Sequence, residues 1–304
     1  MGFLKVCGEF ALKIIVTPPG RIDVVATPIG NLADLSPRAR EVLAAADIIA
    51  AEDTRHTAHL LRQIGVQRPL LSLHEHNEAQ RREELVAQLQ RGTRLALVSD
   101  AGTPLVSDPG YLLVKAALEA GIVVQAVPGA SAVLVALAVS GLPVERFCFE
   151  GFLPARGAAR RERLRSLRHE TRTLVFFEAP HRITETLQDM AGEWGVERAA
   201  CVARELTKTH ETIYRGSLEH LLQIGREDGN FARGEITLVV AGASAQETAP
   251  DDAFVARAFD LLSAELPPSR AAALVAQLTG RRKAEVYARG IRPDARVTPD
   301  QEET

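Results

Sequence analysis

The sequence predicts an α/β protein with two α/β domains and a small helical C-terminal extension. Three observations support this fold class. Apolar segments of strand length alternate with segments of helical periodicity from Arg21 to Val240. This alternation breaks at Gly141-Leu142-Pro143 and then restarts. A small, polar and acidic segment, residues 243–252, precedes a final stretch in which only helical patterns occur.

These breaks define the expected domains. We expect an extension over 1–20, an N-terminal α/β domain over 21–143, a C-terminal α/β domain over 144–242, a linker over 243–252 and a helical tail over 253–304. The first segment is mildly apolar but is interrupted by Glu9 and Lys13, and it has no signal-peptide cleavage motif. We therefore expect it to be a disordered extension.

The first domain is expected to contain five strands joined by helices. The strands cover 22–26, 47–51, 70–74, 94–99 and 122–127. The helices cover 37–45, 54–64 and 78–91, a stretch opened by Asp108-Pro109, and a stretch from PGAS to about Ser140. Ser36 and Pro37 mark the start of the first helix, because serine caps a helix and proline fits its first turn.

The second domain and the tail follow the same rules. Strands are expected over 146–152, 173–178, 199–204 and 235–240, with helices over about 157–169 and 181–193. The tail should form two or three short helices. One of them lies within LPPSRAAALVAQLTG, which has a proline start and a glycine stop.

The composition indicates a soluble cytoplasmic protein with no membrane partner. Of the 304 residues, 46% are hydrophobic and 25% charged, and no apolar run approaches the roughly 20 residues that span a bilayer. Cys7, Cys148 and Cys201 form no CxxC pair, which fits a reducing compartment without disulfides. The net charge of −3 does not favour nucleic acid, so any RNA-binding surface must be local.

Three similar loops are expected at strand ends: Thr27–Asn31, Ser99–Pro104 and Pro128–Ser131. Ligands of parallel sheets bind beyond the carboxyl ends of the strands. Glycine lets a ligand approach the backbone and proline stiffens the loop. One such loop is as readily a simple turn, but three predict a pocket. The chain has neither a P-loop nor a G-x-G-x-x-G motif after its first strand, so a ligand with an adenosine and no phosphate fits better.

A series of motifs resembles the ribosomal small subunit methyltransferase I family of the tetrapyrrole methylase superfamily. The motifs are VATPIGNL (25–32), AAEDTRHT (50–57), LHEHNE (73–78), LVSDAGTPLVSDPG (97–110), EGFLP (150–154), FFEAPHR (176–182), ARELTKTHE (203–211) and GEITLVV (234–240). Their order is that of the family, and the resemblance extends over about 21–290.

The resemblance implies an enzyme that uses S-adenosylmethionine, without a metal, to methylate the ribose 2′-hydroxyl of a cytidine in the decoding region of 16S rRNA, on the small ribosomal subunit. It also implies a homodimer and a cofactor cleft between two domains. Carried over by position, the cofactor-binding residues are Thr27, Pro28, Gly30, Asn31, Asp100, Ala101, Gly102, Thr103, Ser131 and Arg204. Ala130 stands where many members have a proline.

Methyl transfer from a sulfonium needs alignment of oxygen, methyl and sulfur more than it needs a strong base. The candidates for proton acceptance or hydroxyl polarisation are Glu178, Arg182, Glu205, Lys208 and Asp53, with Glu52 beside it, and the sequence assigns the base to none of them. Two alternatives stay open. Glu52 and Asp53 could cap the helix at Thr54, and Glu205 with Lys208 could be a surface ion pair.

His74, His76 and Glu78 form an H-x-H-x-E string. A zinc site is one interpretation, but nothing else in the chain would complete it. A substrate-contacting or capping loop is the preferred alternative.

RNA contacts are expected from an arginine run and from the tail. Seven arginines lie between Arg156 and Arg172 against only two glutamates. Dense positive charge can track phosphates, and it can also be a solvated helix face. The residues assigned to RNA are Arg156, Arg160, Arg161, Arg165, Arg282 and Lys283. The tail could instead brace a dimer.

Two other functions share these features. One is a small-molecule tetrapyrrole methylase, which would hardly need the arginine run and the basic tail. The other is a non-catalytic RNA-binding assembly factor, which predicts no cofactor binding.

Overall fold

The computed structural model describes residues 20–244 and 252–290. The chain divides into two compact units. The first contains the residues up to Arg165 and Thr173–Ala241, and the second contains Ser166–Arg172 and the residues from Gly242 onward. The expected disordered extension (apart from Gly20), residues 245–251 of the expected linker and residues 291–304 lie outside the described residues.

The first sheet of unit 1 has five strands, all parallel, in the order β3-β2-β4-β1-β5. The strands are β1 (Arg21–Val25), β2 (Ile48–Ala51), β3 (Leu70–Ser72), β4 (Arg94–Val98) and β5 (Val123–Val127). All five strands predicted from the sequence are confirmed, with shifts of one or two residues at their ends. The carboxyl ends of β4, β1 and β5 lie side by side in this order.

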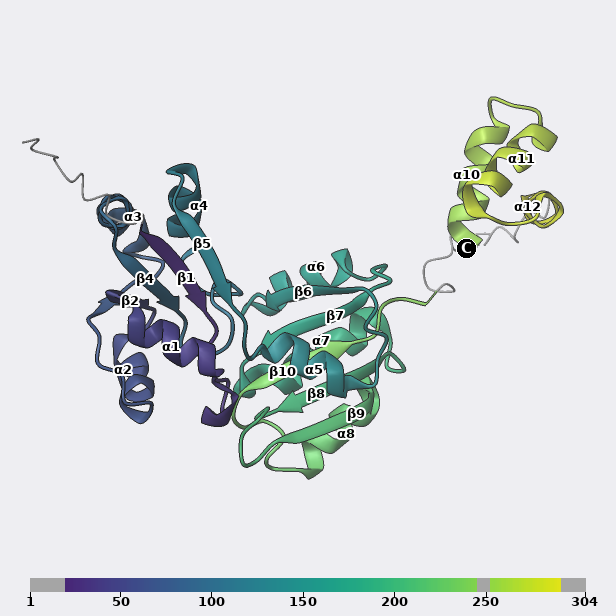
Figure 1. The fold of residues 1–304 in the computed structure, drawn as a ribbon. Coiled ribbons are helices and arrows are strands. Elements are labelled where there is room, and N and C mark those ends of the chain that lie inside the picture. The colour runs from purple at the N-terminus through teal and green to yellow at the C-terminus, as the bar shows by residue number, and fades with distance from the viewer. Residues whose placement is uncertain (1–19, 245–251, 291–304) are drawn as a thin grey trace, which may run out of the picture. The chain divides into compact units, whose positions relative to one another are not determined.

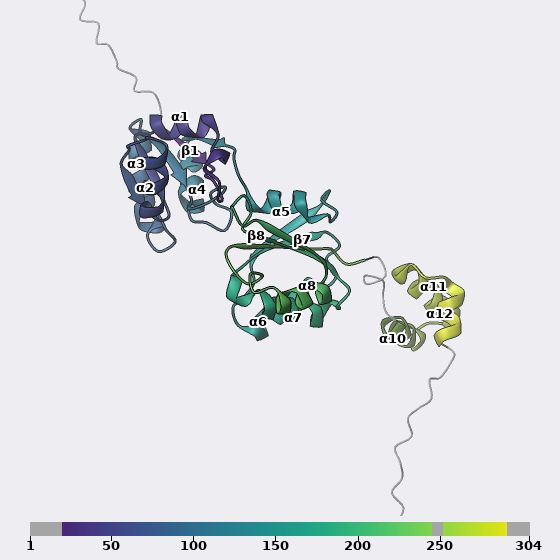
Figure 2. The same ribbon diagram turned by 90° about the horizontal axis from the view of Figure 1, so that it is seen from below.

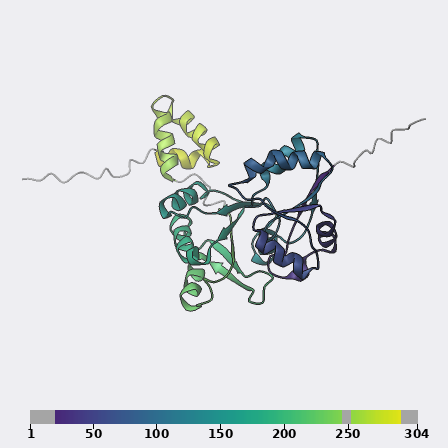
Figure 3. The same ribbon diagram turned by 90° about the vertical axis from the view of Figure 1, so that its left-hand side faces the viewer.

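Helices cover both faces of this sheet (Figures 1 and 3). On one face, α1 (Pro37–Ala45) and α2 (Thr54–Gln63) bury Leu43 and Leu61. On the other face, α3 (Glu78–Gln90) and α4 (Tyr111–Glu119) bury Leu89 and Leu113. The predicted cap of α1 is confirmed, because the Ser36 hydroxyl accepts a hydrogen bond from the Ala39 amide at 3.0 Å.

The second sheet is mixed, in the order β6-β7-β10-β8-β9. Its strands are β6 (Phe147–Phe152), β7 (Thr173–Glu178), β8 (Ala199–Arg204), β9 (Thr212–Ser217) and β10 (Ile236–Val240). β6 pairs in parallel with β7, and the other pairs are antiparallel. The sequence did not predict β9 or the helix after it, α8 (Leu218–Glu227). As an edge strand with half-buried and exposed residues, β9 carries little apolar alternation.

Figure 2 shows the second sheet between α5 (Ala132–Ser140) on one side and α6 (Gly157–Ser166), α7 (Ile183–Trp194) and α8 on the other. A short 3₁₀ turn, Pro180–Arg182, precedes α7. Helix α5 lies before the expected domain boundary at residue 143, but Val133 and Leu137 pack against Val175 and Val239 of the second sheet. We call the first sheet with α1 to α4 the first lobe, and the second sheet with the helices that cover it the second lobe. Judged by packing, the second lobe therefore begins with α5.

Three helices form the described part of the tail: α10 (Asp252–Ser263), α11 (Pro268–Thr279) and α12 (Lys283–Gly290). They enclose a small core that includes Val255, Phe259 and Val275. Helix α11 starts after Pro267 and ends at Gly280 with φ 66°, as the sequence predicted. Within residues 20–244 and 252–290, no helix is long and apolar enough to cross a membrane.

Candidate active site

The three glycine-containing loops follow β1, β4 and β5, and hydrogen bonds join them to one another. The Thr27 amide donates to the Gly102 carbonyl at 2.9 Å, and the Gly102 amide donates back to Thr27 at 3.1 Å. The Thr103 hydroxyl donates to the Ala130 carbonyl at 3.2 Å. The loops therefore form one connected rim at the carboxyl end of the sheet, as expected for a ligand site.

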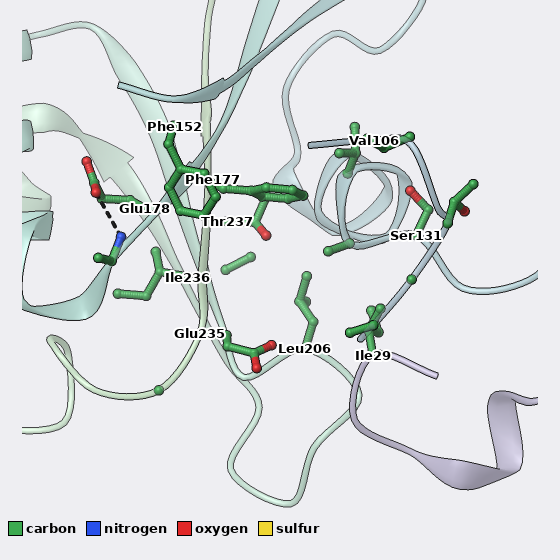
Figure 4. A pocket seen from close by; sticks show the side chains of 18 of the residues that line it. Ile29, Val106, Ser131, Phe152, Phe177, Glu178, Leu206, Glu235, Ile236 and Thr237 are labelled. Carbon is green, nitrogen blue, oxygen red and sulfur yellow. Dashed lines mark hydrogen bonds between the residues drawn. The ribbon is translucent and has the colours of Figure 1, made fainter. Parts of the chain in front are cut away.

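A cavity of about 370 Å³ lies against this rim, and Figure 4 shows its wall. The second lobe supplies the facing wall from the ends of β6, β7 and β10 and from the loop after β8. The lining residues are Ile29, Ala101, Gly102, Thr103, Val106, Asp108, Ser131, Ala132, Val133, Phe152, Phe177, Glu178, Ala179, Pro180, Ala203, Leu206, Gly234, Glu235, Ile236 and Thr237. Among these lining residues every ionisable side chain is acidic. The cavity is therefore suited to an apolar ligand with positive charge rather than to a phosphate.

Left-handed backbone occurs on either side of two apolar lining residues. Leu105 and Ser107, with φ of 74° and 67°, flank Val106, and Glu205 and Thr207, with φ of 53° and 64°, flank Leu206. This conformation is costly for residues with a Cβ atom, and it clusters at functional sites. The two apolar side chains belong to opposite lobes and both contribute to the cavity wall (Figure 4).

Four of the ten predicted cofactor residues line the cavity directly: Ala101, Gly102, Thr103 and Ser131. Thr27 lies behind them, buried, with its hydroxyl donating to the Ser99 carbonyl at 3.3 Å.

Gly30 lies where the first loop meets the second lobe. A Cβ atom there would be 2.3 Å from Cγ of Lys208. Asn31 caps the 3₁₀ turn η1 (Leu32–Asp34) by accepting from the Ala33 amide at 3.0 Å. Pro28 stands between Thr27 and the cavity-lining Ile29 and is not itself among the lining residues. These three residues are therefore placed to shape the loop rather than to line the cavity.

Two predicted cofactor residues are turned to other partners. The Asp100 carboxylate accepts a hydrogen bond from the Asp53 amide at 3.1 Å, and Asp100 is not among the lining residues. The buried Arg204 guanidinium donates to the Arg233 carbonyl at 2.9 Å and the His210 carbonyl at 2.7 Å. It holds the backbone around the loop after β8, instead of facing the cavity as the sequence suggested.

Glu178 and Arg182, both predicted as catalytic candidates, form a buried ion pair. Glu178 is 3% exposed, and its carboxylate accepts from the Thr186 hydroxyl at 2.6 Å and from the Ala179 amide at 2.8 Å. Arg182 pairs with it at 3.2 Å and donates to the Leu153 carbonyl at 2.7 Å. These bonds occupy both carboxylate oxygens, so the pair is built to position the backbone near the cavity.

Glu205 and Lys208, the other predicted catalytic pair, are also bonded to each other. The Lys208 ammonium lies 2.8 Å from Glu205 and 3.2 Å from Glu235. Burial alone would raise the pKa of Glu205, but the hydrogen bonds from Lys208 and from the Glu235 amide lower it overall. This ion pair lies against Gly30 in the loop after β1, so it is more than the surface pair that the sequence allowed.

Asp53 caps α2, which is the alternative that the sequence left open. Its carboxylate accepts from the Arg55 amide at 2.8 Å and pairs with the Arg55 guanidinium at 2.7 Å. The hydrogen bond from Arg55 lowers the pKa of Asp53 to about 2. A carboxylate held in this way is a poor proton acceptor.

Two neighbouring carboxyls behave in the opposite way. Burial, and then the charges of Asp108 and Asp100, raise the pKa of Glu52. Burial also raises the pKa of Asp108, against a hydrogen bond from Ser99 that lowers it. Asp108 lines the cavity and was not predicted as a site residue, because Asp108-Pro109 was interpreted as a helix start. In the structure α4 begins at Tyr111, after Gly110 with φ 117°.

Other lining residues that the sequence did not predict are apolar: Ile29, Val106, Phe152, Phe177, Leu206 and Ile236. Apolar side chains at strand ends are indistinguishable from core residues in a single sequence. Only the position of Phe152 within the EGFLP motif could have drawn attention to it.

The zinc interpretation of His74, His76 and Glu78 receives no support. Glu78 is buried and accepts from the Leu113 amide at 2.9 Å, so it ties α3 to α4. The His74 ring lies 3.1 Å from the Asn77 amide nitrogen. Within the described parts of the chain, no three histidine, cysteine or acidic side chains are grouped to hold a metal.

Only some of the arginines predicted for an RNA-binding surface are exposed. Arg160 was wrongly placed there, because its side chain is fully buried and pairs with Asp189 at 2.6 Å and Glu185 at 2.8 Å. Arg161 pairs with Asp189 at 3.3 Å and Arg165 with Glu193 at 3.0 Å, but both remain exposed. Acidic residues of α7 thus offset much of the local charge.

Arg156 is exposed and lies within unit 1. It has no ion-pair partner in the described part of the chain. In the tail, Arg282 pairs with Glu285 at 2.6 Å and Lys283 donates to the Ser269 hydroxyl at 3.3 Å. The structure therefore makes Arg156 the most available of the predicted RNA-binding cations.

Comparison with known proteins agrees with the fold. Residues 21–222 match the Tetrapyrrole (Corrin/Porphyrin) Methylases, and residues 248–293 match the RsmI C-terminal HTH domain. A Ribosomal RNA small subunit methyltransferase I from Xylella fastidiosa (strain Temecula1 / ATCC 700964) is 53% identical over 272 residues, which cover 90% of this chain and 99% of that protein. The protein of the same name from Escherichia coli O157:H7 is 51% identical over 269 residues, covering 88% of this chain and 93% of that protein.

The chain belongs to the ribosomal RNA small subunit methyltransferase I family. The resemblance inferred from the eight motifs is thereby confirmed. The predicted fold class is confirmed as well. The methyltransferase CobJ matches with a TM-score of 0.55 and 22% identity over 74% of this chain and 95% of that one. Diphthine synthase matches with a TM-score of 0.54 and 17% identity over 75% and 92%. At these identities the likeness concerns the fold that this family shares with them.

Proposed function

We propose that this protein is an S-adenosylmethionine-dependent methyltransferase that modifies the ribose 2′-hydroxyl of a cytidine in the decoding region of 16S rRNA, on the assembled small ribosomal subunit. The observation that carries the proposal is the cavity, with its connected loops and exclusively acidic charge. The names of the relatives, which are ribosomal RNA small subunit methyltransferases, support the substrate.

The residues present fit the proposed cofactor. S-adenosylmethionine is cationic at its sulfonium and ammonium groups and carries no phosphate, and it supplies the methyl group when bound. The lining offers Asp108 and Glu235 to positive charge, and apolar side chains such as Ile29 and Leu206 to an adenosine. The backbone of Gly102 can approach a ligand closely, since a glycine there has no side chain to interpose.

Asp108 is the group to which we assign the hydroxyl proton. It lines the cavity, and its raised pKa makes its carboxylate a better base than an ordinary aspartate. Three other acidic candidates are engaged elsewhere: Glu178 with Arg182, Glu205 with Lys208 and Asp53 with Arg55. Glu52 also has a raised pKa, but it is not among the lining residues. Because alignment supplies much of the rate, the base needs to contribute only a modest factor.

A homodimer is part of the proposal. Strand β5 is an edge strand with most of its residues exposed. Tyr111 and Leu118 on the neighbouring helix α4 are 63% and 58% exposed. An edge strand beside large exposed apolar side chains is typical of a surface that another chain covers.

The decisive experiment is a transfer assay with methyl-labelled S-adenosylmethionine and small subunits from cells that lack the modification. We expect label in 16S rRNA, on the ribose of one cytidine. Naked 16S rRNA serves as the comparison substrate and should be modified more slowly. Label on a base, or label in tetrapyrrole acceptors and none in RNA, would contradict the proposal. Cofactor binding without transfer to any acceptor would favour an assembly factor.

A further inference from the structure

Strand β6 contains a bulge that changes the direction of its last side chain. Phe149 lies opposite Val175 of β7, but Gly151 lies opposite Phe176 and Phe152 opposite Phe177. One extra residue is therefore inserted between Phe149 and Gly151. Gly151 adopts φ 65°, the left-handed conformation that favours glycine at a bulge.

The bulge places Phe152 on the same face of the sheet as Phe149. In a regular strand, residues three apart point to opposite faces. Here Phe152 joins Phe177 at a ring separation of 5.7 Å, and Phe177 contacts Phe149 at 4.9 Å. This face is the one that α5 covers and on which the cavity opens.

Phe152 differs from its two aromatic neighbours in its exposure. Phe149 and Phe177 are half-buried beneath α5, whereas Phe152 is 57% exposed although it lines the cavity (Figure 4). Burying such a ring entirely would stabilise the fold, so leaving it exposed at a cavity indicates a binding surface.

The segment after Phe152 is held by hydrogen bonds and leads to an exposed arginine. Arg182 donates to the Leu153 carbonyl at 2.7 Å and to the Pro154 carbonyl at 3.3 Å, and Glu178 fixes Arg182 in turn. Arg156 follows two residues later and is exposed. The buried ion pair of the FFEAPHR motif thus holds the backbone between the cavity-lining Phe152 and the exposed Arg156.

We propose that Phe152 is the platform on which a nucleobase of the RNA substrate stacks, and that Arg156 binds an adjoining phosphate. The inference rests on the proposed function and names the residues that position its substrate. Aromatic side chains stack on bases of any sequence, and arginine pairs with phosphate. The nucleobase is favoured over the adenine of the cofactor because the glycine loops form the opposite wall and Phe152 is more than half exposed.

The test compares Phe152→Ala, Phe152→Leu and Phe152→Tyr in the full-length protein. Binding of small subunits is measured by filter retention, methylation by steady-state kinetics, and S-adenosylmethionine affinity by calorimetry. Loss of stacking on one base corresponds to a weakening of about 10- to 100-fold. We expect Phe152→Ala and Phe152→Leu to raise KM and Kd for subunits by such a factor, Phe152→Tyr to keep both near the wild-type values, and cofactor affinity to stay within about twofold.

Phe147→Leu is the matched control, because Phe147 is a partly exposed phenylalanine at the other end of β6 and is not among the lining residues. It should leave subunit binding unchanged. Equal function of Phe152→Leu and wild type would overturn the inference, since simple apolar contact would then suffice. A fall in cofactor affinity equal to the loss for subunits would overturn it as well, and would assign the ring to the cofactor. If the wild-type protein bound subunits without methylating them, the proposed function would be contradicted. The effect of the Phe152 variants on subunit binding would still test whether Phe152 contacts the RNA.

Discussion

The acidic residues that line the cavity differ in how far their carboxyl groups are engaged in hydrogen bonds and ion pairs. Asp108 is the acidic lining residue whose pKa burial raises, whereas Glu178 is fully engaged in hydrogen bonds. A carboxyl with a higher pKa in the folded than in the unfolded state favours folding when protonated. Its charge therefore opposes folding above that pKa, and the penalty is absent well below the unfolded value.

Asp108→Asn should consequently separate activity from stability. We expect kcat to fall by about 100-fold, at the low end of what general bases contribute. The free energy of unfolding should rise at pH 7, with a gain that disappears as the pH falls below the ordinary aspartate pKa of 3.8. The rate of the wild-type protein should fall as the pH drops through the raised pKa of Asp108. The rate of the variant should not show this fall on the acidic side of its pH–rate profile. The measurements are pH–rate profiles and denaturant unfolding at several pH values. A variant that is slower and also less stable at pH 7 would point to a structural role.

Gly30 provides a second prediction at this scale. An alanine Cβ would lie 2.3 Å from Cγ of Lys208 and 3.1 Å from the Leu206 carbonyl oxygen, so the loop after β1 and the loop after β8 could not both keep their places. We expect Gly30→Ala to cost about 1–3 kcal/mol of stability, as overpacking does. Cofactor affinity, measured by calorimetry, should fall at least about tenfold, or by more than 1.4 kcal/mol.

Gly192→Ala is the control for Gly30, because a Cβ there meets nothing within 4 Å and the residue is inside α7. It should stabilise the protein by up to about 1 kcal/mol, since alanine favours a helix. Equal behaviour of the two variants would show that Lys208 moves aside without consequence.

The sequence predicted the polar part of the site better than its apolar part. Glycine and threonine in the three loops could be assigned to a pocket. One such loop is readily explained as a turn, but three similar loops at strand ends predict a ligand site. The sequence allowed two interpretations of Asp53, a catalytic candidate and a helix cap, and in the structure its carboxylate caps α2. Glu178 was expected in the cleft, but its burial depends on Thr186 and Arg182, which reach it only in the folded chain. The direction of Phe152 depends on a bulge that no local pattern encodes.

At the scale of helices and strands, the most informative correction concerns α6 and α7. The seven arginines between Arg156 and Arg172 looked like one basic surface, because the sequence does not show that the helix expected over about 157–169 packs against the helix expected over 181–193. Three acidic residues of α7 meet arginines of α6, and each lies 25 to 29 residues further along the chain than its partner: Glu185, Asp189 and Glu193. Helical periodicity describes one segment at a time, so it could not predict that these two helices pair.

Arg160 and Arg161 are therefore expected to behave differently, although they are adjacent. Arg160→Gln should destabilise the protein by about 3–5 kcal/mol, because it breaks a buried ion pair and leaves Asp189 with only the longer contact to the exposed Arg161. Arg161→Gln should cost less than about 1 kcal/mol, as exposed pairs do. Denaturant unfolding followed by circular dichroism measures both. Losses of similar size would mean that the two arginines share one role at the helix interface.

The central strands were predicted with nearly their observed limits, whereas one edge strand of the second sheet was missed. The continuous apolar runs of β4 and β7 correspond to buried residues, and their predicted limits are nearly those observed. β9 (Thr212–Ser217) contains an exposed arginine and a glycine, and it is recognised only through its pairing with β8. Helix α8 has a serine cap at Ser217 but follows an unrecognised strand, so its start was missed.

For the whole molecule, the division into two units raises the question of what the tail contributes. Helices α10 to α12 have their own core, which includes Phe259 and Val286. The short stretch Gly242–Ala243 contacts Glu170 and Thr171, since the Ala243 amide donates to the Glu170 carbonyl at 2.6 Å. A chain ending after Ser244 keeps these contacts and both sheets, and removes the three helices.

We expect this shortened chain to fold and to bind S-adenosylmethionine with wild-type affinity, because every residue lining the cavity precedes Val240. Methylation of small subunits should fall by about tenfold or more, the consequence of losing several phosphate contacts from a basic module. Light scattering decides between the two roles that the sequence left open for the tail. A dimer that persists while methylation falls assigns the tail to RNA, and KM for subunits should then carry the loss. A monomer would assign the tail to the dimer interface, in which case the exposed face of α4 and β5 is not sufficient to hold two chains together. Unchanged methylation and an unchanged dimer would exclude both roles.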